Sequence, residues 1–241
     1  MAPHQESELP LIDFRTETPG GEVRTFVLPR PERFAFEPGQ YVWFEVADRT
    51  AYPMAIASGI HDANLEFSIR GNPGNQELFS KSAGDLIRIS SAMGSAFPSV
   101  HLDTNSPLVL VAGGTGVTPV RSILRSLREP ERARIVVGTR GPKELMYTDE
   151  LTNHPDVTLT VENPDADWSG VTGRVTDYLE PLSDTAVVFV CGPNPMMAAV
   201  RDQFRGAGVP LGRVYLSVQA LDAEGQVLGP VLPADHPSIP F

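Results

Sequence analysis

The feature that most constrains this chain is an apolar run that leads directly into glycines. Residues 107–112 read PLVLVA and residues 113–116 read GGTG. A continuous apolar run is typical of a strand buried on both faces of a parallel sheet. Proline is favoured in the first turn of a helix, and the residues that follow predict a helix over Pro119–Arg128. Further strands are expected at 134–138, 157–161, 186–191 and 214–218, and further helices around 145–151, 171–179 and 195–206. This strand–helix repeat predicts an α/β, doubly wound parallel sheet.

The residues before this repeat follow a different pattern. Short segments of period-two alternation are separated by turn signals, as expected of an antiparallel barrel. The predicted strands are 24–28, 40–46, 64–70 and 85–90, with a turn at 34–39 and one short helix at 77–82. We therefore expect two domains, a β-barrel over 1–103 and an α/β domain over 107–219. A tail follows at 220–241, which we expect to be either a surface strap or disordered.

Composition excludes several classes of function. Lys and Arg number 19 against 30 Asp and Glu, so the net charge is −11. This acidity disfavours binding to nucleic acid phosphates or to anionic lipid surfaces. The single cysteine, Cys191, allows neither an intrachain disulfide nor a cysteine-ligated iron–sulfur cluster within this chain. We see no signal peptide and no apolar run of membrane-spanning length, and we expect a cytoplasmic protein without a metal site.

Two glycine turns are candidates for ligand binding. Residues 109–119 read VLVAGGTGVTP and residues 187–197 read VVFVCGPNPMM, so each turn follows a buried strand. Ligands of open α/β sheets bind outside the carboxyl ends of the strands, where glycine lets the main chain approach a diphosphate. Taken alone, the first motif fits a tight turn equally well, since it lacks the G-x-G-x-x-G spacing. Cys191 taken alone is a small buried hydrophobic residue.

Together, the barrel, AGGTGVTP and CGP-x-x-M resemble the ferredoxin–NADP reductase superfamily from about Arg24 to Ser217. The resemblance implies a barrel that holds FAD and an α/β domain that holds NAD(P)H. The nicotinamide would deliver hydride to the flavin, with Cys191 and Thr118 flanking its C4. The resemblance assigns cofactor binding to Tyr52, Pro53, Met54, Ala55, Ile56, Ser58, Arg70, Gly71, Gly74, Asn75, Gln76, Gly113, Gly114, Thr115, Gly116, Thr118, Arg140, Gly192, Pro193 and Met196.

The flavin motif of this chain departs from that of the family. The segment FEPGQY at 36–41 matches, but the usual Arg-x-Tyr-Ser is Tyr52-Pro53-Met54-Ala55 here. The family's diphosphate-binding arginine and the serine near flavin N5 are both absent. We expect Arg70 to supply the missing cation, since a guanidinium matches phosphate oxygens, although it also fits a solvated strand arginine. Backbone groups of 54–58 and the side chain of Asn75 or Gln76 would complete the site.

Cofactor choice and partners are less constrained by these motifs. Glu162 follows the strand 157–161 and would repel the 2′-phosphate of NADPH, which favours NADH, whereas Arg140 and Lys143 would compensate. Iron–sulfur relatives carry cysteines after their last strand, and residues 217–224 of this chain contain none. The resemblance therefore implies FAD and NAD(P)H without an iron–sulfur cluster.

The leading hypothesis is a flavin-dependent NAD(P)H oxidoreductase that passes electrons to an unidentified acceptor. The alternatives are an electron-transfer subunit of a larger redox complex and a nucleotide-binding module without catalysis. Arg121, Arg125 and Arg128 share one face of the predicted helix, and Arg132 and Arg134 follow. We expect either a solvated face or a docking surface for a small acidic carrier such as a ferredoxin or flavodoxin.

Overall fold

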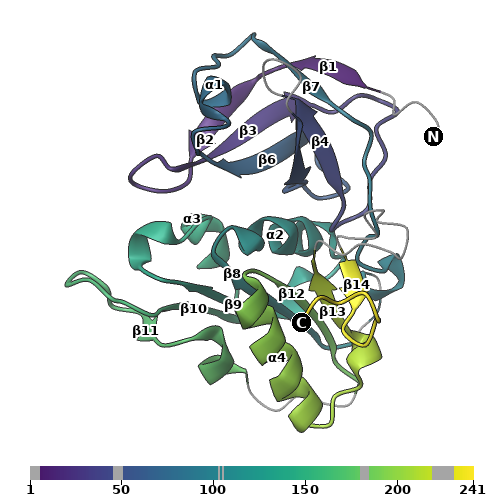
Figure 1. Cartoon of the computed structure of the whole chain (residues 1–241), viewed down its shortest axis with the longest axis vertical. Helices are drawn as coiled ribbons and strands as arrows, with labels where there is room; N and C mark the ends of the chain where they lie inside the picture. The colour runs from purple at the N-terminus through teal and green to yellow at the C-terminus, as the bar shows by residue number, and fades with distance from the viewer. Residues whose placement is uncertain (1–5, 46–50, 103, 105, 180–184, 219–230) are drawn as a thin grey trace.

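The computed structural model describes residues 6–45, 51–102, 104, 106–179, 185–218 and 231–241. Its N-terminal part folds into two antiparallel sheets that enclose an aromatic core (Figure 1). Phe26, Phe44 and Phe67 are fully buried between the sheets, and the rings of Phe44 and Phe67 lie 5.3 Å apart. The first sheet has the order β1 (Ser7–Pro10), β7 (Leu86–Ile89), β4 (Tyr41–Glu45), β5 (Ala51–Ala55), and the second has the order β2 (Asp13–Thr16), β3 (Val23–Pro29), β6 (Asn64–Arg70). The short helix α1 covers Gln76–Phe79.

The C-terminal part is built on one seven-stranded sheet. Its order is β11 (Val171–Thr172), β10 (Val157–Val161), β9 (Ala133–Thr139), β8 (Leu108–Gly113), β12 (Val187–Cys191), β13 (Val214–Ser217), β14 (Val231–Pro233). All neighbours are parallel except β13 and β14. Every residue of the central strand β8 is buried, as its unbroken apolar run predicts. The predicted two-part architecture, a barrel followed by a doubly wound sheet, is confirmed.

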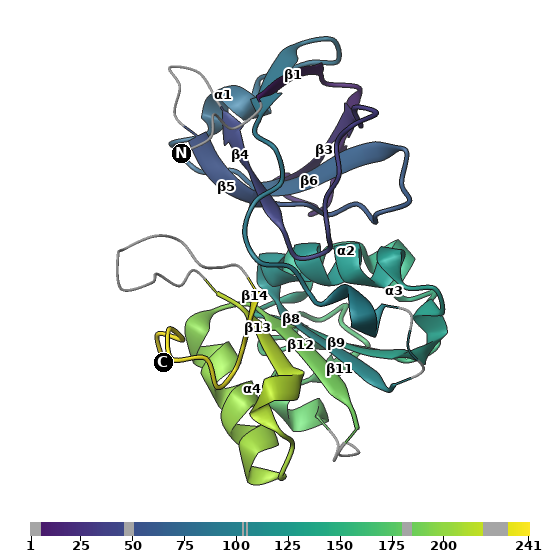
Figure 2. The ribbon, with the colours of Figure 1, turned by 90° about the vertical axis from the view of Figure 1, so that its right-hand side faces the viewer.

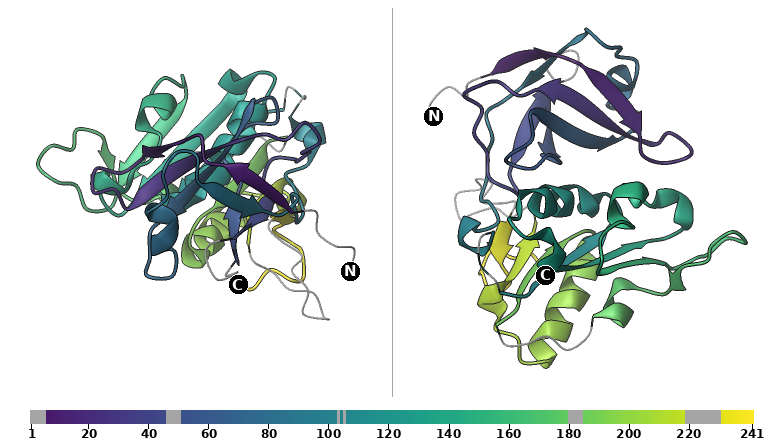
Figure 3. Two further views of the ribbon diagram at one scale, coloured as in Figure 1. Left: turned by 90° about the horizontal axis from the view of Figure 1, so that it is seen from above. Right: turned by 180° about the vertical axis from the view of Figure 1, so that it is seen from behind.

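Helices cover both faces of the parallel sheet. Figures 1 and 2 show α2 (Val117–Ser126) and α3 (Thr148–Leu151) on the face toward the barrel and α4 (Asn194–Gly206) on the opposite face. The helix α2 therefore lies between the sheet and the barrel, a position also visible from behind in Figure 3. Among the described residues, no helix combines the length and apolar character that crossing a bilayer requires.

The short helix predicted at 77–82 covers only Gln76–Phe79. Two other predicted helices are shorter than expected or absent. The helix predicted over 171–179 is replaced by β11 and a 3-10 turn at Val175–Tyr178. Gly173 between them has φ +142°, which an α-helix does not accommodate. The helix predicted over 145–151 begins only at Thr148, because Tyr147 adopts the left-handed conformation with φ +55°. Both differences arise from single backbone dihedrals that apolar periodicity does not encode.

The described part of the tail packs against both parts of the chain. Strand β14 pairs antiparallel with β13, and the Ser95 hydroxyl of the barrel part donates to the carbonyl of Val231 at 2.6 Å. The guanidinium of Arg201 lies over the ring of Phe241, 5.5 Å from its centroid. Residues 231–233 thus add a strand to the sheet, with Val231 and Leu232 buried, which the sequence did not predict. Residues 219–230 lie outside the described residues, and the tail predicted over 220–241 stays a prediction. The domain boundary predicted near 103–106 stays a prediction.

Candidate dinucleotide and flavin site

Two strand-to-helix turns meet at the carboxyl edge of the parallel sheet. Ala112 at the end of β8 is in register with Cys191 at the end of β12, so both turns begin at one level. A Cβ added to Gly116 would lie only 2.3 Å from the carbonyl oxygen of Cys191. Glycine is required here because the two main chains leave no room for a side chain. The predicted placement of both motifs at one sheet edge is confirmed.

Gly114 has a different reason to be glycine. Its φ is +55°, a left-handed value, and a Cβ added there would meet nothing within 4 Å. The main chain at Gly114 therefore faces open space, immediately before α2 begins at Val117. Unpaired N–H groups at the start of a helix attract anions. The turn thus fits a diphosphate, which needs close main-chain approach without competing side chains.

A cleft of about 970 Å³ opens between this edge and the barrel. Its volume is at the upper end of the range of small-molecule sites, roughly 300–1,000 Å³. The cleft brings together the predicted residues Pro53, Ala55, Arg70, Gly113, Gly114, Thr115, Gly116, Arg140, Cys191, Gly192, Pro193 and Met196. Residues that are distant in sequence and come from both parts of the chain thus line one space of dinucleotide size.

The barrel wall of the cleft is formed by alternate residues of β5. Pro53 and Ala55 line the cleft, whereas Tyr52 and Met54 pack against the barrel core. The Tyr52 hydroxyl donates to the carbonyl of Gly74 at 3.1 Å, and a Cβ on Gly74 would lie 2.7 Å from that hydroxyl. Tyr52 and Gly74 therefore close the barrel loop against itself.

Several predicted contacts are absent from the cleft lining. Ile56 and Ser58 are fully buried, and the Ser58 hydroxyl accepts from the backbone N–H of Glu66. Asn75 is also fully buried, and its side chain donates to the carbonyl of Arg70 and accepts from the N–H of Asn72. The prediction that Asn75 contacts a cofactor through its side chain is wrong, because its hydrogen-bonding groups already close the 70–75 loop. Gly71 and the exposed Gln76 flank this loop outside the cleft lining.

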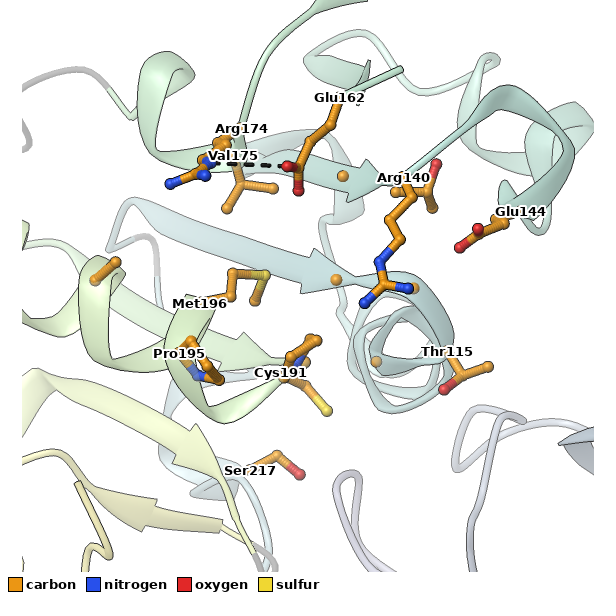
Figure 4. Close-up of a pocket in the computed structure, with 18 of the residues that line it drawn as sticks. Thr115, Arg140, Glu144, Glu162, Arg174, Val175, Cys191, Pro195, Met196 and Ser217 are labelled. Atoms are coloured by element: carbon orange, nitrogen blue, oxygen red, sulfur yellow. Dashed lines mark ion pairs between the residues drawn. The ribbon is translucent and has the colours of Figure 1, made fainter. Parts of the chain in front are cut away.

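Cys191 and Ser217 stand side by side on β12 and β13. They are register partners, and both line the cleft (Figure 4). Burial raises the pKa of the Cys191 thiol to about 11, with a smaller opposing effect of the Ser217 hydroxyl. Cys191 is therefore a neutral thiol at physiological pH, which suits an orienting contact better than nucleophilic attack. Thr118, predicted to flank the same substrate group, is instead buried in the first turn of α2 and does not line the cleft.

Charged side chains gather at the far end of the cleft. Figure 4 shows Glu162 and Arg174 turned toward one another, with Arg140 nearby. The carboxylate of Glu162 lies 3.7 Å from the guanidinium of Arg174, and both side chains are substantially exposed. Lys143, predicted to offset the charge of Glu162, does not line the cleft, whereas Glu144 does. This end of the cleft therefore presents two arginines and two carboxylates.

The arginine surface predicted as a docking site is not an open patch. Arg121 is only 4% exposed, and its guanidinium binds Glu66 at 2.6 Å and Glu150 at 2.7 Å. Arg125 pairs with Asp62 of the barrel at 2.8 Å. The spacing correctly places both arginines on one helix face, but the barrel covers that face. The prediction of an exposed docking surface is therefore wrong for Arg121, whereas Arg125 is exposed but paired with the barrel.

The other arginines of the predicted patch differ among themselves. Arg128 is exposed beyond the end of α2. Arg132 donates to the carbonyl oxygen of Ser106 at 2.6 Å, and Arg134 donates to that of Tyr178 at 3.0 Å. Arg132 and Arg134 therefore hold neighbouring loops and do not extend a continuous basic surface.

Sequence reasoning missed five lining residues with polar side chains: Thr139, Glu144, Arg174, Thr176 and Ser217. Arg174 and Thr176 were assigned to a helix that does not form, which hid their position at the sheet edge. Ser217 lies inside the strand predicted over 214–218 and ends the observed β13, which neighbours β12 in the sheet. In the described part of the chain, no cluster of His, Cys, Asp or Glu is arranged to hold a metal ion.

A barrel joined to a doubly wound sheet, with a glycine-lined cleft between them, defines the class of two-domain FAD- and NAD(P)-binding oxidoreductases. Residues 110–202 match the family model of the oxidoreductase NAD-binding domain. The structure superimposes with a TM-score of 0.74 on a ferredoxin NADP+ reductase from Neisseria gonorrhoeae with bound FAD and NADP, at 19% identity over 88% of this chain and 97% of that one. The chain therefore has the two-domain fold of the ferredoxin–NADP reductase superfamily, and its residues 110–202 are similar to the oxidoreductase NAD-binding domain.

Two curated relatives are electron-transfer components. The chain is 31% identical over 209 residues to the toluate 1,2-dioxygenase electron transfer component of Pseudomonas putida, with 79% of this chain and 61% of the relative covered. It is 30% identical over 210 residues to the propane 2-monooxygenase reductase component of Rhodococcus jostii, with 77% and 56% covered. The chain thus spans about three fifths of the length of these two relatives.

Proposed function

We propose that this protein takes hydride from NADH onto FAD and passes the electrons on to a separate redox partner. The observation that carries the proposal is the shared cleft, in which the glycine turns of β8 and β12 face Pro53 and Ala55 of the barrel. When bound there, FAD supplies the chemistry, since it accepts a hydride and releases electrons one at a time. The protein supplies the binding, the orientation and the local electrostatics.

The nucleotide wall has two tasks. The open main chain at Gly114 and the start of α2 would bind the diphosphate of the dinucleotide. Cys191, held neutral by its raised pKa and placed beside Ser217, would orient the nicotinamide without reacting. A neutral thiol adds no charge to a site where positive charge develops on the nicotinamide ring.

The barrel wall would hold the flavin with few side-chain contacts. Arg70 is exposed at the end of β6, lines the cleft and is the arginine of the barrel wall. We propose that it binds the FAD diphosphate in place of the family arginine, which is Tyr52 here. Arg70→Ala should weaken FAD binding at least tenfold, because a charge-assisted contact contributes roughly 1.5–3 kcal/mol. The matched control is Arg88→Ala. Arg88 is an arginine on β7 that pairs with Glu8 and Glu45, and its loss should leave FAD binding unchanged.

The charges at the far end of the cleft support NADH as the electron donor. Glu162 repels a 2′-phosphate and can accept hydrogen bonds from the ribose hydroxyls of NADH. It also pairs with Arg174 at 3.7 Å, which keeps that guanidinium from a phosphate. Glu162→Gln should therefore raise the ratio of kcat/KM for NADPH to that for NADH, because Arg174 becomes available to the phosphate and the repelling carboxylate is removed.

The acceptor is proposed from relatives whose names describe electron-transfer and reductase components of oxygenases. The 241 residues contain one cysteine, so an iron–sulfur centre in the pathway would reside outside this chain segment. A separate iron–sulfur protein, or another one-electron acceptor, would then carry the electrons away.

Anaerobic stopped-flow spectroscopy tests the proposal directly. Purified protein should be yellow, and mixing the FAD-loaded form with NADH should bleach its flavin absorbance faster than mixing with NADPH. Protein that binds FAD and nucleotide but is reduced by neither would favour the second candidate, a binding module without catalysis. That candidate is favoured by one observation, the replacement of the N5-proximal serine by Ala55 at the cleft.

A further inference from the structure

We propose that Arg121 is a positioning residue for hydride transfer, fixing the barrel wall of the cleft relative to the nucleotide wall. The inference rests on the proposed function, since it concerns the alignment of the two walls that would hold FAD and NADH. Arg121 does not line the cleft itself. It acts through the barrel segment Ala57–Ile60, which continues directly from the lining residues of β5.

Three side chains of α2 hold this barrel segment by its main chain. Arg121 donates to the carbonyl of Ala57 at 3.2 Å, and Ser122 donates to the carbonyl of Ser58 at 2.8 Å. One turn further along, the Ser126 hydroxyl accepts from the N–H of Ile60 at 3.0 Å. The contact is so close that a Cβ on Gly59 would lie 2.6 Å from the carbonyl oxygen of Arg125. Side chains of α2 therefore hold the main chain of the segment Ala57–Ile60 in place along its whole length.

The same helix begins at the nucleotide-binding turn. Gly116 immediately precedes α2, and Arg121 follows it by five residues, which is about 7.5 Å along a helix axis at 1.5 Å per residue. A helix is stiff over that length. Its start is packed on Cys191 through Gly116, and its barrel-facing side is bonded to Ala57. The helix therefore sets the spacing between the two walls of the cleft.

Arg121 is a buried charge whose ion pairs hold α2 against the barrel. Its guanidinium binds Glu66 of the barrel and Glu150 of the α/β domain, at 2.6 and 2.7 Å. Burial lowers the pKa of the guanidinium, but the two carboxylates outweigh this effect and the net shift is upward. Arg15 also binds Glu66 at 2.7 Å. A buried charge is tolerated only when it is paired, so the domains cannot separate or slide without exposing or breaking these pairs.

Tyr147 of the α/β domain adds further contacts between the two domains. Its ring lies under the guanidinium of Arg121, with 4.8 Å from the guanidinium carbon to the ring centroid. Its hydroxyl hydrogen-bonds to that of Ser68, two residues before Arg70 on β6. Tyr147 is also the one non-glycine residue with positive φ in the described part of the chain. Such a backbone persists only where the surrounding contacts over-determine it, and here they span both domains.

The test compares Arg121→Lys with Arg128→Lys. Lysine keeps the charge of Arg121 but cannot reach Glu66, Glu150 and Ala57 at once, because it lacks the planar fork of five donors. We expect flavin reduction by saturating NADH to slow at least tenfold, with FAD content and KM for NADH within twofold of wild type. Arg128→Lys changes an exposed arginine just beyond the end of the same helix and should stay within twofold.

A second readout does not depend on turnover. Hydrogen exchange of the amides of 57–60 and 117–126 should accelerate in apo Arg121→Lys and stay unchanged in apo Arg128→Lys. Glu66→Gln, which preserves side-chain size, should show the same two effects in weaker form, and it decides the matter if Arg121→Lys does not fold. If wild type is reduced by NADH and the Arg121 and Glu66 variants match it in rate and exchange, the positioning role is refuted while the proposed function stands. If wild type itself is not reduced by either nucleotide, the proposed function fails first.

Discussion

Gly116 offers the sharpest quantitative test of how the two glycine turns make the cleft. In Gly116→Ala the new Cβ would lie 2.3 Å from the carbonyl oxygen of Cys191, and the next atoms, the Cys191 carbonyl carbon and the Gly192 nitrogen, lie at 2.5 and 2.9 Å. Ordinary contact begins at 3.4 Å. All three obstacles are main-chain atoms, so no side-chain rotation can relieve the clash. The turn after β8 and the turn after β12 must move apart by about 1 Å.

The size of the effect follows from that displacement. Overpacking of a close contact destabilises by about 1–3 kcal/mol, and each 1 kcal/mol lowers Tm by roughly 2–4 °C in a protein of this size. A misplacement of about 1 Å at a reacting centre reduces rate by about 100-fold. We therefore expect Gly116→Ala to melt at least about 2 °C below wild type and to lose hydride transfer far more than stability alone explains.

Gly206→Ala is the matched control. Gly206 is the last residue of α4, and a Cβ there would meet nothing within 4 Å. Alanine at such a position stabilises by about 0.4–1 kcal/mol, mainly by restricting the unfolded chain. Calorimetry and anaerobic stopped-flow measurements on both variants give the comparison. A Gly116→Ala protein that melts with wild type and reduces its flavin equally fast would show that the two turns are not in the close contact described above.

Three further outcomes follow from the site and the domain interface. Ala55→Ser should accelerate flavin reduction in stopped-flow traces by about tenfold or more, since it places a hydrogen-bond donor at the cleft where Ala55 has none; an unchanged rate would refute this. Because burial raises its pKa to about 11, Cys191 should react with iodoacetamide at pH 8 much more slowly in the folded protein than in the unfolded one, as mass spectrometry would show. Burial raises the pKa of Glu66, but Arg15 and Arg121 outweigh burial and hold it below its usual value. Glu66 therefore stabilises the fold above its unfolded pKa of about 4.3, and this contribution is lost as pH falls through the lower folded value, so denaturation midpoints between pH 3 and 6 should depend less on pH in Glu66→Gln.

The parts of the site that local sequence dictates were predictable. Strands β6 and β10 were predicted with their observed bounds, Asn64–Arg70 and Val157–Val161, because alternation or an apolar run between turn signals defines a strand by itself. The two glycine turns were placed correctly at one sheet edge, because the carboxyl ends of parallel strands necessarily lie together. In both cases the information lies within a few consecutive residues.

The domain interface was not predictable by the same means. The spacing of Arg121 and Arg125 correctly indicates a shared helix face, but spacing says nothing about what covers that face. Glu66, the barrel partner of Arg121, is 55 residues away in sequence. Nothing in the local sequence distinguishes an arginine destined for a buried carboxylate from one in water. Only the fold, which places β6 opposite α2, makes that pairing.

Pro53 of the barrel wall made strand β5 hard to predict from sequence and also helps to form the cleft. Pro53 interrupts the segment Ala51–Ala55, and proline within a short run argues against a strand, so β5 was not predicted. The sheet order makes the proline acceptable, because β5 lies at the edge of its sheet and hydrogen-bonds only to β4. Once the segment is a strand, its period of two turns Met54 toward the barrel core and leaves Pro53 and Ala55 for the cleft. A proline without an N–H cannot recruit another strand, and the edge therefore stays free to form one wall of the cleft.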